Sequence, residues 1–218
     1  MNTAVVIPAR DEEALIEACL ESVAQAAPAA LIVVVADSCV DATASIARRF
    51  GTVIEVNAAS VGKARRAGVA AAIAAADSSD LWIANTDADS VVPPNWMQQQ
   101  LALAADVVVG TVRPAANDLS ESEWIAWHAT HDDGQALGHV HGANLGFRGD
   151  AYLTVGGYAP LDEHEDNDLV HRLHTAGFTI SATDQCEVVT SGRRIGRTPG
   201  GYAGYLRNGA FATVPVRV

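Results

Sequence analysis

The sequence predicts an α/β fold: a Rossmann-like, mostly parallel sheet flanked by helices. Four short apolar segments alternate with stretches of helical periodicity, which is typical of βαβ units; they are Ala4–Ile7, Leu31–Val35, Thr52–Val56 and Leu81–Ala84. The first two are unbroken apolar runs, as expected for strands buried on both faces of a parallel sheet. Polar residues lie within a few positions of the ends of three of the segments. Ligands of such sheets bind beyond the carboxyl ends of the strands.

Helices are expected between these strands, at Glu12–Ala27, Asp41–Arg49 and Gly62–Ala76. The first has apolar side chains along one side and ends before Pro28, which cannot continue a helix. Asp41 is placed to cap the second helix. The third is rich in alanine and carries three basic residues in its first turns, Lys63, Arg65 and Arg66.

The second half of the chain is less regular and chemically different. We expect helices at Asn95–Ala104, around Trp124–His128, at Asp150–Val155 and at Asp166–Ala176, and strands at Asp106–Val112, Gly142–Arg148, Thr179–Ala182 and Glu187–Thr190. Gly177 is placed to end the last helix. All seven histidines lie between His128 and His174. We therefore expect one domain, 1–218, with two functional halves, 1–112 and 113–218.

Composition restricts the classes of partner and the location. The chain of 218 residues is 49% hydrophobic and 18% charged, as in globular proteins. Its net charge of −12 argues against binding nucleic acid or anionic lipid. The cysteines Cys19, Cys39 and Cys186 have no metal-binding spacing, which favours a reduced cytoplasmic environment. No apolar run approaches the ~20 residues of a membrane span and no signal peptide is evident, so we expect a soluble protein.

The stretch LWIANTDADSVVPP, Leu81–Pro94, carries the main chemical signal. Asp87 and Asp89 are separated by one residue and follow the point where the apolar strand breaks into polar residues. At the carboxyl end of a strand both carboxylates can converge on a hard cation, and oxygen ligands favour Mn²⁺ or Mg²⁺ over zinc. The alternative is that both are turn residues, with Ser90 as a cap.

Parallel pairing would bring three such strand ends together. Pro8–Asp11, Ala36–Ser38 and Asp87–Asp89 follow the first, second and fourth strands. We expect them to lie along one edge of the sheet, where a ligand would bind.

Four segments in this order resemble family 2 glycosyltransferases of the GT-A fold. They are VVIPARDEE (Val5–Glu13), VVVADSCVDAT (Val33–Thr43), NTDADS (Asn85–Ser90) and the stretch from the Gly-Gly-Tyr turn through Glu-Asp-Asn-Asp-Leu (Gly156–Gly177). The resemblance implies an inverting enzyme that moves a sugar from a UDP- or GDP-linked donor to an acceptor hydroxyl, with Mn²⁺ or Mg²⁺ as cofactor. Residues 1–112 would then bind the nucleotide sugar, and residues 113–218, the smaller lobe, the acceptor.

The chain departs from the family pattern at two places. Ala36 stands where many relatives have the first Asp of a pair, which leaves Asp37 as the carboxylate for the nucleobase. The Gln-x-x-Arg-Trp signature of processive synthases is absent, which favours a single transfer. The sequence leaves open whether the protein forms a homodimer.

The resemblance assigns the donor side to the strand ends. Asp37 would accept an N–H of the base, although it could instead form an Asx-turn with Cys39. Asp87 and Asp89 would hold the cation. Further donor contacts are expected from Pro8, Ala9, Arg10, Lys63, Arg65, Arg66, Arg193 and Arg194. The alternative for basic residues on an alanine-rich helix is a solvated face.

On the acceptor side Asp166 is the candidate base. Glu165 and Asp168 are its acidic neighbours. Repulsion among the three carboxylates would raise the pKa of one of them, which suits a general base. Glu165 is the second candidate. Acidic residues are favoured at helix N-termini whatever their function, so the cluster also has a structural explanation. His141, Gly142 and Asn144 are expected beside the acceptor.

Three alternatives remain at this stage. His128, His131, His139 and His141 could hold zinc, although no cysteine or HExxH-like context supports such a site. A nucleotidyltransferase would share the layout but would begin with a glycine-rich phosphate loop, and Pro8–Asp11 contains no glycine. A non-catalytic nucleotide-sugar-binding module would need neither the metal pair nor the acidic cluster.

Overall fold

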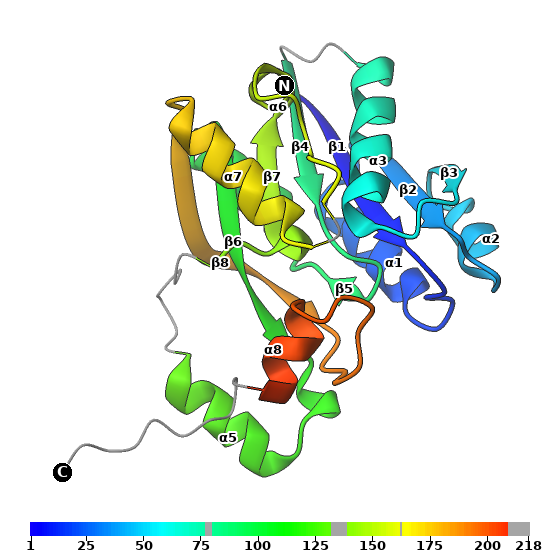
Figure 1. Ribbon diagram of the computed structural model, residues 1–218, viewed down its shortest axis with the longest axis vertical. Coiled ribbons are helices and arrows are strands. Elements are labelled where there is room, and N and C mark those ends of the chain that lie inside the picture. The colour runs from blue at the N-terminus through cyan, green and yellow to red at the C-terminus, as the bar shows by residue number, and fades with distance from the viewer. Residues whose placement is uncertain (77–79, 132–138, 162, 209–218) are drawn as a thin grey trace.

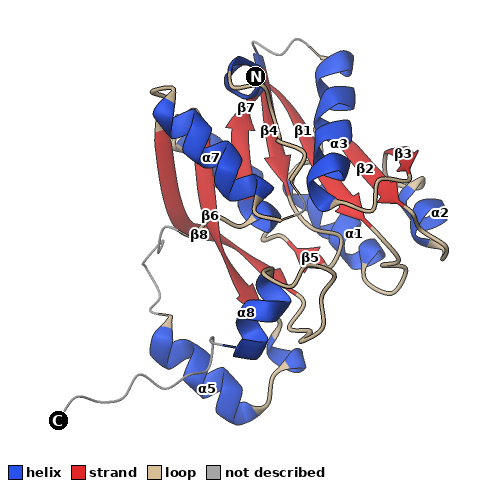
Figure 2. Ribbon diagram, in the orientation of Figure 1, coloured by secondary structure: helices blue, strands red, loops and turns tan. Residues whose placement is uncertain are grey.

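The computed structural model describes residues 1–76, 80–131, 139–161 and 163–208. Within these residues an eight-stranded mixed sheet has the order β3-β2-β1-β4-β7-β6-β8-β5, with helices on both of its faces (Figures 1 and 2). The predicted α/β class is confirmed. No helix in these ranges is both long and apolar enough to cross a bilayer.

The elements of the first half are β1 (Asn2–Ala9), α1 (Ile16–Ala26), β2 (Leu31–Asp37), α2 (Thr43–Ala47), β3 (Thr52–Val56), α3 (Val61–Ala75), β4 (Leu81–Asn85), β5 (Ser90–Val91), α4 (Trp96–Ala102) and β6 (Val107–Pro114). Those of the second half are the 3₁₀ turn η2 (Ala116–Asp118), α5 (Glu121–Thr130), the 3₁₀ turn η3 (Gly142–Asn144), β7 (Leu145–Arg148), α6 (Gly149–Thr154), α7 (Glu165–Thr175), β8 (Ile180–Thr190) and α8 (Tyr202–Asn208).

The four predicted strands of the first half form the parallel part of the sheet. β1 lies between β2 and β4 and is parallel to both, and β2 is parallel to β3. β1 is buried on both faces: Val5 and Ile7 belong to the core under α1 and α4, whereas Ala4 and Val6 pack on the side of α3. Because these strands run the same way, their carboxyl ends lie on one edge.

The rest of the sheet is mixed. β7 is antiparallel to β4 and β6, while β6 is parallel to β8. β8 is one long strand rather than the two expected at Thr179–Ala182 and Glu187–Thr190, because a register shift opposite Gly110–Val112 lets pairing with β6 continue.

Several boundaries differ from those that the sequence predicted. Helix α1 begins at Ile16 rather than Glu12, because Asp11 has a positive φ of 47° and the backbone turns there before the helix starts. Ser90 starts β5 instead of capping a helix, and its hydroxyl donates to the Oγ1 of Thr190. Gly142–Asn144 is a 3₁₀ turn before β7, and helix α8 was not expected at all.

Gly68 permits the close approach of α3 to the sheet. A Cβ at this position would lie 2.5 Å from Val6 Cγ1 and 2.9 Å from Val35 Cγ2, below ordinary contact distance. Both valines belong to strands that lead directly to the ligand edge.

We expect Gly68→Ala to lower the free energy of unfolding by about 1–3 kcal/mol, the usual cost of overpacking a core. Chemical denaturation is the measurement, and Ala70→Ser, on the exposed side of the same helix, should change stability by less than about 0.5 kcal/mol. A Gly68→Ala protein as stable as the wild type would show that α3 can move away from the sheet.

Candidate functional site

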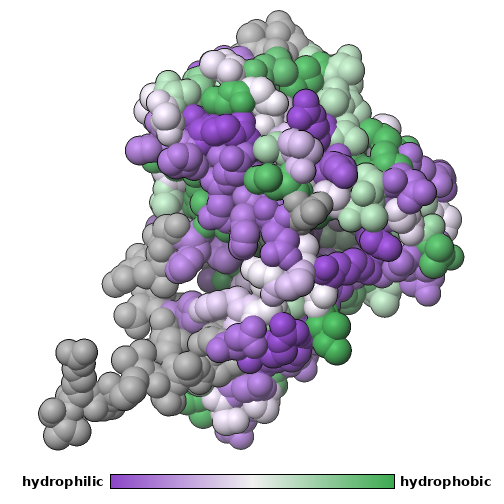
Figure 3. All heavy atoms as spheres, viewed as in Figure 1, coloured by the Kyte–Doolittle hydropathy of each residue, from purple (hydrophilic) through white to green (hydrophobic). Residues whose placement is uncertain are grey.

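A cavity of about 900 Å³ lies at the predicted edge. Its wall includes residues from the ends of β1, β2 and β4, namely Pro8, Ala9, Arg10, Asp37, Asp87 and Asp89. The rest of the wall comes from the segment before η3, the start of α7 and the segment after β8. Hydrophilic residues gather on the molecular surface over α7 (Figure 3). The expected convergence of three strand ends is therefore present in the structure.

Asp37, at the end of β2, is buried and accepts several hydrogen bonds. The backbone N–H groups of Ala58 and Ala59 donate to Oδ1 at 2.8 and 2.9 Å, and that of Ser60 donates to Oδ2 at 2.9 Å. Burial alone would raise the pKa of Asp37, but these donors lower it. The side chain thus orders the turn into α3 instead of forming the Asx-turn with Cys39, and it still faces the cavity.

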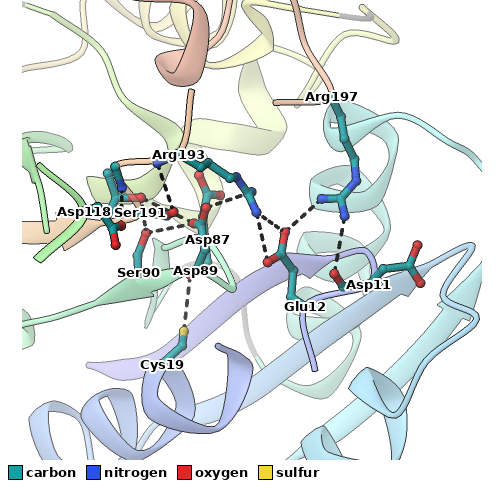
Figure 4. A network of polar contacts seen from close by, with 12 residues as sticks. Asp11, Glu12, Cys19, Asp87, Asp89, Ser90, Asp118, Ser191, Arg193 and Arg197 are labelled. Atoms are coloured by element: carbon teal, nitrogen blue, oxygen red, sulfur yellow. Dashed lines mark hydrogen bonds and ion pairs between the residues drawn. The ribbon is translucent and has the colours of Figure 1, made fainter. Parts of the chain in front are cut away.

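The two carboxylates of the Asp-x-Asp sequence point the same way. Ala88 between them packs into the core, and Asp87 and Asp89 both line the cavity. The guanidinium of Arg65 lies 2.5 Å from an Asp87 oxygen. That of Arg193 lies 2.8 Å from an Asp89 oxygen (Figure 4). Burial and the nearby Asp87 raise the pKa of Asp89 to about 6, against the effect of Arg193.

Only Arg65 of the three basic residues at the start of α3 lines the cavity. It is 4% exposed and makes ion pairs with Asp87 and Glu165. Lys63 and Arg66 are exposed and stand outside the cavity wall, and Arg66 donates to the carbonyl of Tyr158. The phosphate contacts that the sequence suggested for Lys63 and Arg66 therefore do not agree with their positions.

The acidic cluster at the start of α7 divides into three environments. Glu165 is buried against Arg65, and burial raises its pKa although Arg65 opposes the change. Asp166 lines the cavity and accepts the backbone N–H of Gly142 at 2.8 Å. Asp168 is outside the cavity wall and pairs with Arg172. Asp166 is therefore the one carboxylate of the three that faces the cavity without an arginine partner among the described contacts.

Of the three residues expected beside the acceptor, His141 and Gly142 line the cavity and Asn144 does not. His141 lines the cavity, and burial lowers its pKa to about 4 although Asp166 opposes the change, so its imidazole is neutral at pH 7. Gly142 also lines the cavity, and a Cβ there would lie 2.4 Å from Arg65 Nη2. Asn144 was expected beside the acceptor, but it is fully buried and outside the cavity wall.

The amide of Asn144 is a structural crosslink. Its oxygen accepts the indole N–H of Trp96 at 2.8 Å, and its nitrogen donates to the carbonyls of Thr111 and Cys186, both at 2.9 Å. These contacts join α4, β6 and β8 and use the side chain fully. The position of Asn144 two residues after Gly142 gave no indication of this, because its partners lie on elements far away in the sequence.

The histidines do not assemble as a zinc site in the described part of the chain. There, the group of potential ligands that meet is Asp11, Cys39 and Asp41, and it includes no histidine. His131 stacks on Trp127 with ring centroids 3.6 Å apart, and its Nε2 lies 2.8 Å from the hydroxyl of Tyr205. Aromatic packing therefore accounts for His131.

The segment after β8 passes beside Asp89 of the Asp-x-Asp sequence. Arg193 contacts both Asp89 and Glu12, and Arg197 also pairs with Glu12 (Figure 4). Arg194 points the other way, pairs with Glu123, and does not line the cavity, contrary to the expectation that it contacts the donor.

The wall also contains residues that sequence reasoning missed, among them Glu12, Arg197, Tyr202 and Tyr205. Glu12 could have been found, because it follows the first strand in the same loop as Arg10. The tyrosines could not, because α8 lies in a glycine-rich stretch without clear periodicity.

Known proteins resemble the chain in sequence pattern and in fold. Residues 4–155 match the sequence model of glycosyl transferase family 2. TarS 1-349 of S. aureus in complex with UDP superposes with a TM-score of 0.68 at 15% identity, covering 88% of this chain and 60% of that chain. The mannosyltransferase PcManGT from Pyrobaculum calidifontis, in complex with GDP-Man and Mn²⁺, gives 0.66 at 21% identity, with 90% and 58% coverage.

Glucosyl-3-phosphoglycerate synthase from Mycobacterium tuberculosis, with Mn²⁺, UDP and glucosyl-3-phosphoglycerate, gives a TM-score of 0.59 at 17% identity, with 87% and 70% coverage. The chain spans about 60% of the TarS fragment. No curated protein sequence matches the chain significantly.

Asp37 should give the stability of the protein a measurable pH dependence. Its pKa is depressed in the folded state, so its contribution is present above the unfolded value of about 3.9 and is lost as the pH falls through the folded pKa. We expect Asp37→Asn to cost about 1–3 kcal/mol at pH 7 and progressively less below about pH 4. Urea denaturation from pH 7 to pH 3 measures it, with Glu21→Gln, exposed on α1, as the control. A cost that is constant with pH would show that the charge of Asp37 contributes nothing.

Proposed function

The chain belongs to glycosyl transferase family 2, and from this we propose that it transfers a sugar from a nucleotide diphosphate sugar to an acceptor hydroxyl. The observation that carries the proposal is the shared cavity. Asp37, the pair Asp87 and Asp89, and Asp166 come from β2, the turn after β4 and α7, yet all face the same space. Structures with this fold contain UDP or GDP-Man, two of them with Mn²⁺.

The donor would lie along the strand ends. The hydrogen bonds from the turn before α3 hold Asp37 ionised and fixed. Its carboxylate would accept an N–H of the nucleobase with a remaining lone pair. Pro8, Ala9 and Arg10 form the adjacent wall for base and ribose. A uracil and a guanine base both present such an N–H, so either a UDP- or a GDP-linked donor satisfies this contact.

The residues at the turn after β4 fit a hard divalent cation. Asp87 and Asp89 supply only oxygen ligands, and Asp89 is nearly buried, with Asp87 close enough to raise its pKa. Mn²⁺ or Mg²⁺ held by these carboxylates would neutralise the donor diphosphate and the charge that develops on the leaving group. Without a cation, the carboxylates of Asp87 and Asp89 would repel the negative charge of a diphosphate.

Asp166 is the residue we assign as general base for the acceptor hydroxyl. The N–H of Gly142 fixes one of its oxygens, while Glu165 is committed to Arg65. A single base opposite the donor suits an inverting displacement, and we propose one transfer per binding event. His141, neutral and beside the same space, would orient the acceptor.

The cation should be needed for tight nucleotide binding. UDP or GDP should bind at least about tenfold more tightly with Mn²⁺ than with EDTA, because the metal offsets repulsion between diphosphate and carboxylates. Asp89→Ala should abolish the difference. Isothermal titration calorimetry with both nucleotides measures this effect, and equal affinity in EDTA would remove the metal from the proposed reaction.

Removing the base should slow the chemical step alone. Asp166→Asn keeps size and most hydrogen bonding, so we expect donor turnover, including hydrolysis by water, to fall about 10²–10⁴-fold. The donor dissociation constant should change less than about threefold, under 0.7 kcal/mol.

Asp168→Asn is the matched control, since Asp168 pairs with Arg172 outside the cavity wall. It should lower the melting temperature more than turnover. Wild-type turnover in Asp166→Asn would transfer the role to Glu165, whereas joint loss of donor binding and turnover would assign Asp166 to the cation site.

A further inference from the structure

Arg193 lies between two buried carboxylates of the cavity wall. Its Nη2 is 2.8 Å from Oδ2 of Asp89, and its Nη1 is 2.8 and 3.1 Å from the two carboxylate oxygens of Glu12 (Figure 4). The side chains of Asp89 and Glu12 are only 10% and 7% exposed. The guanidinium of Arg193 therefore contacts two carboxylates that water barely reaches, and Arg197 is a second partner of Glu12.

A cation bound by Asp89 must compete with this guanidinium. The oxygen of Asp89 that Arg193 contacts belongs to the Asp-x-Asp sequence, and a divalent ion there would sit beside a fixed positive charge. Like charges a few ångströms apart in a partly buried site repel each other strongly. Arg193 must therefore leave Asp89 when the cation binds, or weaken that binding by staying.

We propose that Arg193 is the internal counter-ion of the cation site. The divalent cation displaces its guanidinium from Asp89, and the guanidinium then binds the donor diphosphate. This inference rests on the proposed function. Arginine binds diphosphate oxygens through its planar fork, so the displaced side chain has a new partner in the same cavity. Arg197 also holds Glu12, and it can keep the segment after β8 anchored while Arg193 moves.

The exchange makes two binding constants change in opposite directions. In Arg193→Ala, Mn²⁺ alone should bind about tenfold more tightly, because its competitor is gone. UDP or GDP in saturating Mn²⁺ should bind about tenfold more weakly, because a phosphate contact is lost; close charge pairs at binding sites are commonly worth this much. Electron paramagnetic resonance of free Mn²⁺ measures the first constant, and calorimetry measures the second.

Arg194→Ala is the matched control. It removes the same charge from the next residue, whose partner is Glu123 outside the cavity, and it should leave both constants within about twofold. In the Arg193→Ala protein, a further Glu12→Gln substitution should weaken Mn²⁺ binding again, since it removes a carboxylate from the vacated site.

Two results would overturn the inference. One is Mn²⁺ affinity that is equal in the wild type and Arg193→Ala, including no detectable binding by either protein. The other is an Arg194→Ala effect as large as that of Arg193→Ala, which would show a long-range charge effect only. Failure of the proposed function is distinguishable, because wild-type protein would then bind neither nucleotide in the presence of Mn²⁺.

Discussion

Compensation of carboxylates by arginines is the constraint on which the cavity depends. An unpaired charge in such a site costs several kcal/mol, so carboxylates can converge there only with cations between them. Arg65 joins Asp87 to Glu165, and Arg193 joins Asp89 to Glu12. Each arginine thus links carboxylates that belong to different segments, and together they connect α3, the turn after β4, α7 and the segment after β8.

The first of these links also fixes the position of the candidate base. The guanidinium of Arg65 fills the space where a side chain at Gly142 would stand, so a larger residue at this position would displace Arg65. The N–H of Gly142 in turn holds Asp166. The geometry of the proposed base therefore follows from a buried ion pair two contacts away, although Arg65 itself lies on the donor side of the cavity.

The first half of the fold could be predicted because its signals are local. Unbroken apolar strands such as Ala4–Ile7 require burial on both faces, and their parallel order brings Asp37 and Asp87 to one edge without further information. Arg65 was within reach of the same reasoning. Arg65 precedes the buried Val69 by one helical turn and so lies on the side of α3 that packs inward, whereas Lys63 and Arg66 do not lie on that side.

Other features depended on contacts between distant segments. Asn144 is a core residue because Trp96, Thr111 and Cys186 surround it, and no local pattern near Gly142 encodes those partners. The continuous β8 depends on a register shift in its pairing with β6, where Gly110 pairs with Thr183 but Val112 pairs with Val188. Arg193 and Arg194 are adjacent in an irregular stretch, so their opposite directions follow only from where Glu12 and Glu123 lie.

The same charge compensation explains how a chain of net charge −12 can bind a phosphorylated ligand. Bulk electrostatics oppose such a ligand, yet they favour a divalent cation, and the carboxylates at the cavity concentrate that preference. In the proposed function the cation reverses the local charge, so the diphosphate meets positive charge only after the cation has bound. A guanidinium that is released at the same moment adds to this reversal. The acidity of the protein then becomes a reason for metal dependence, and the order of binding follows from the charges of Asp89 and Arg193.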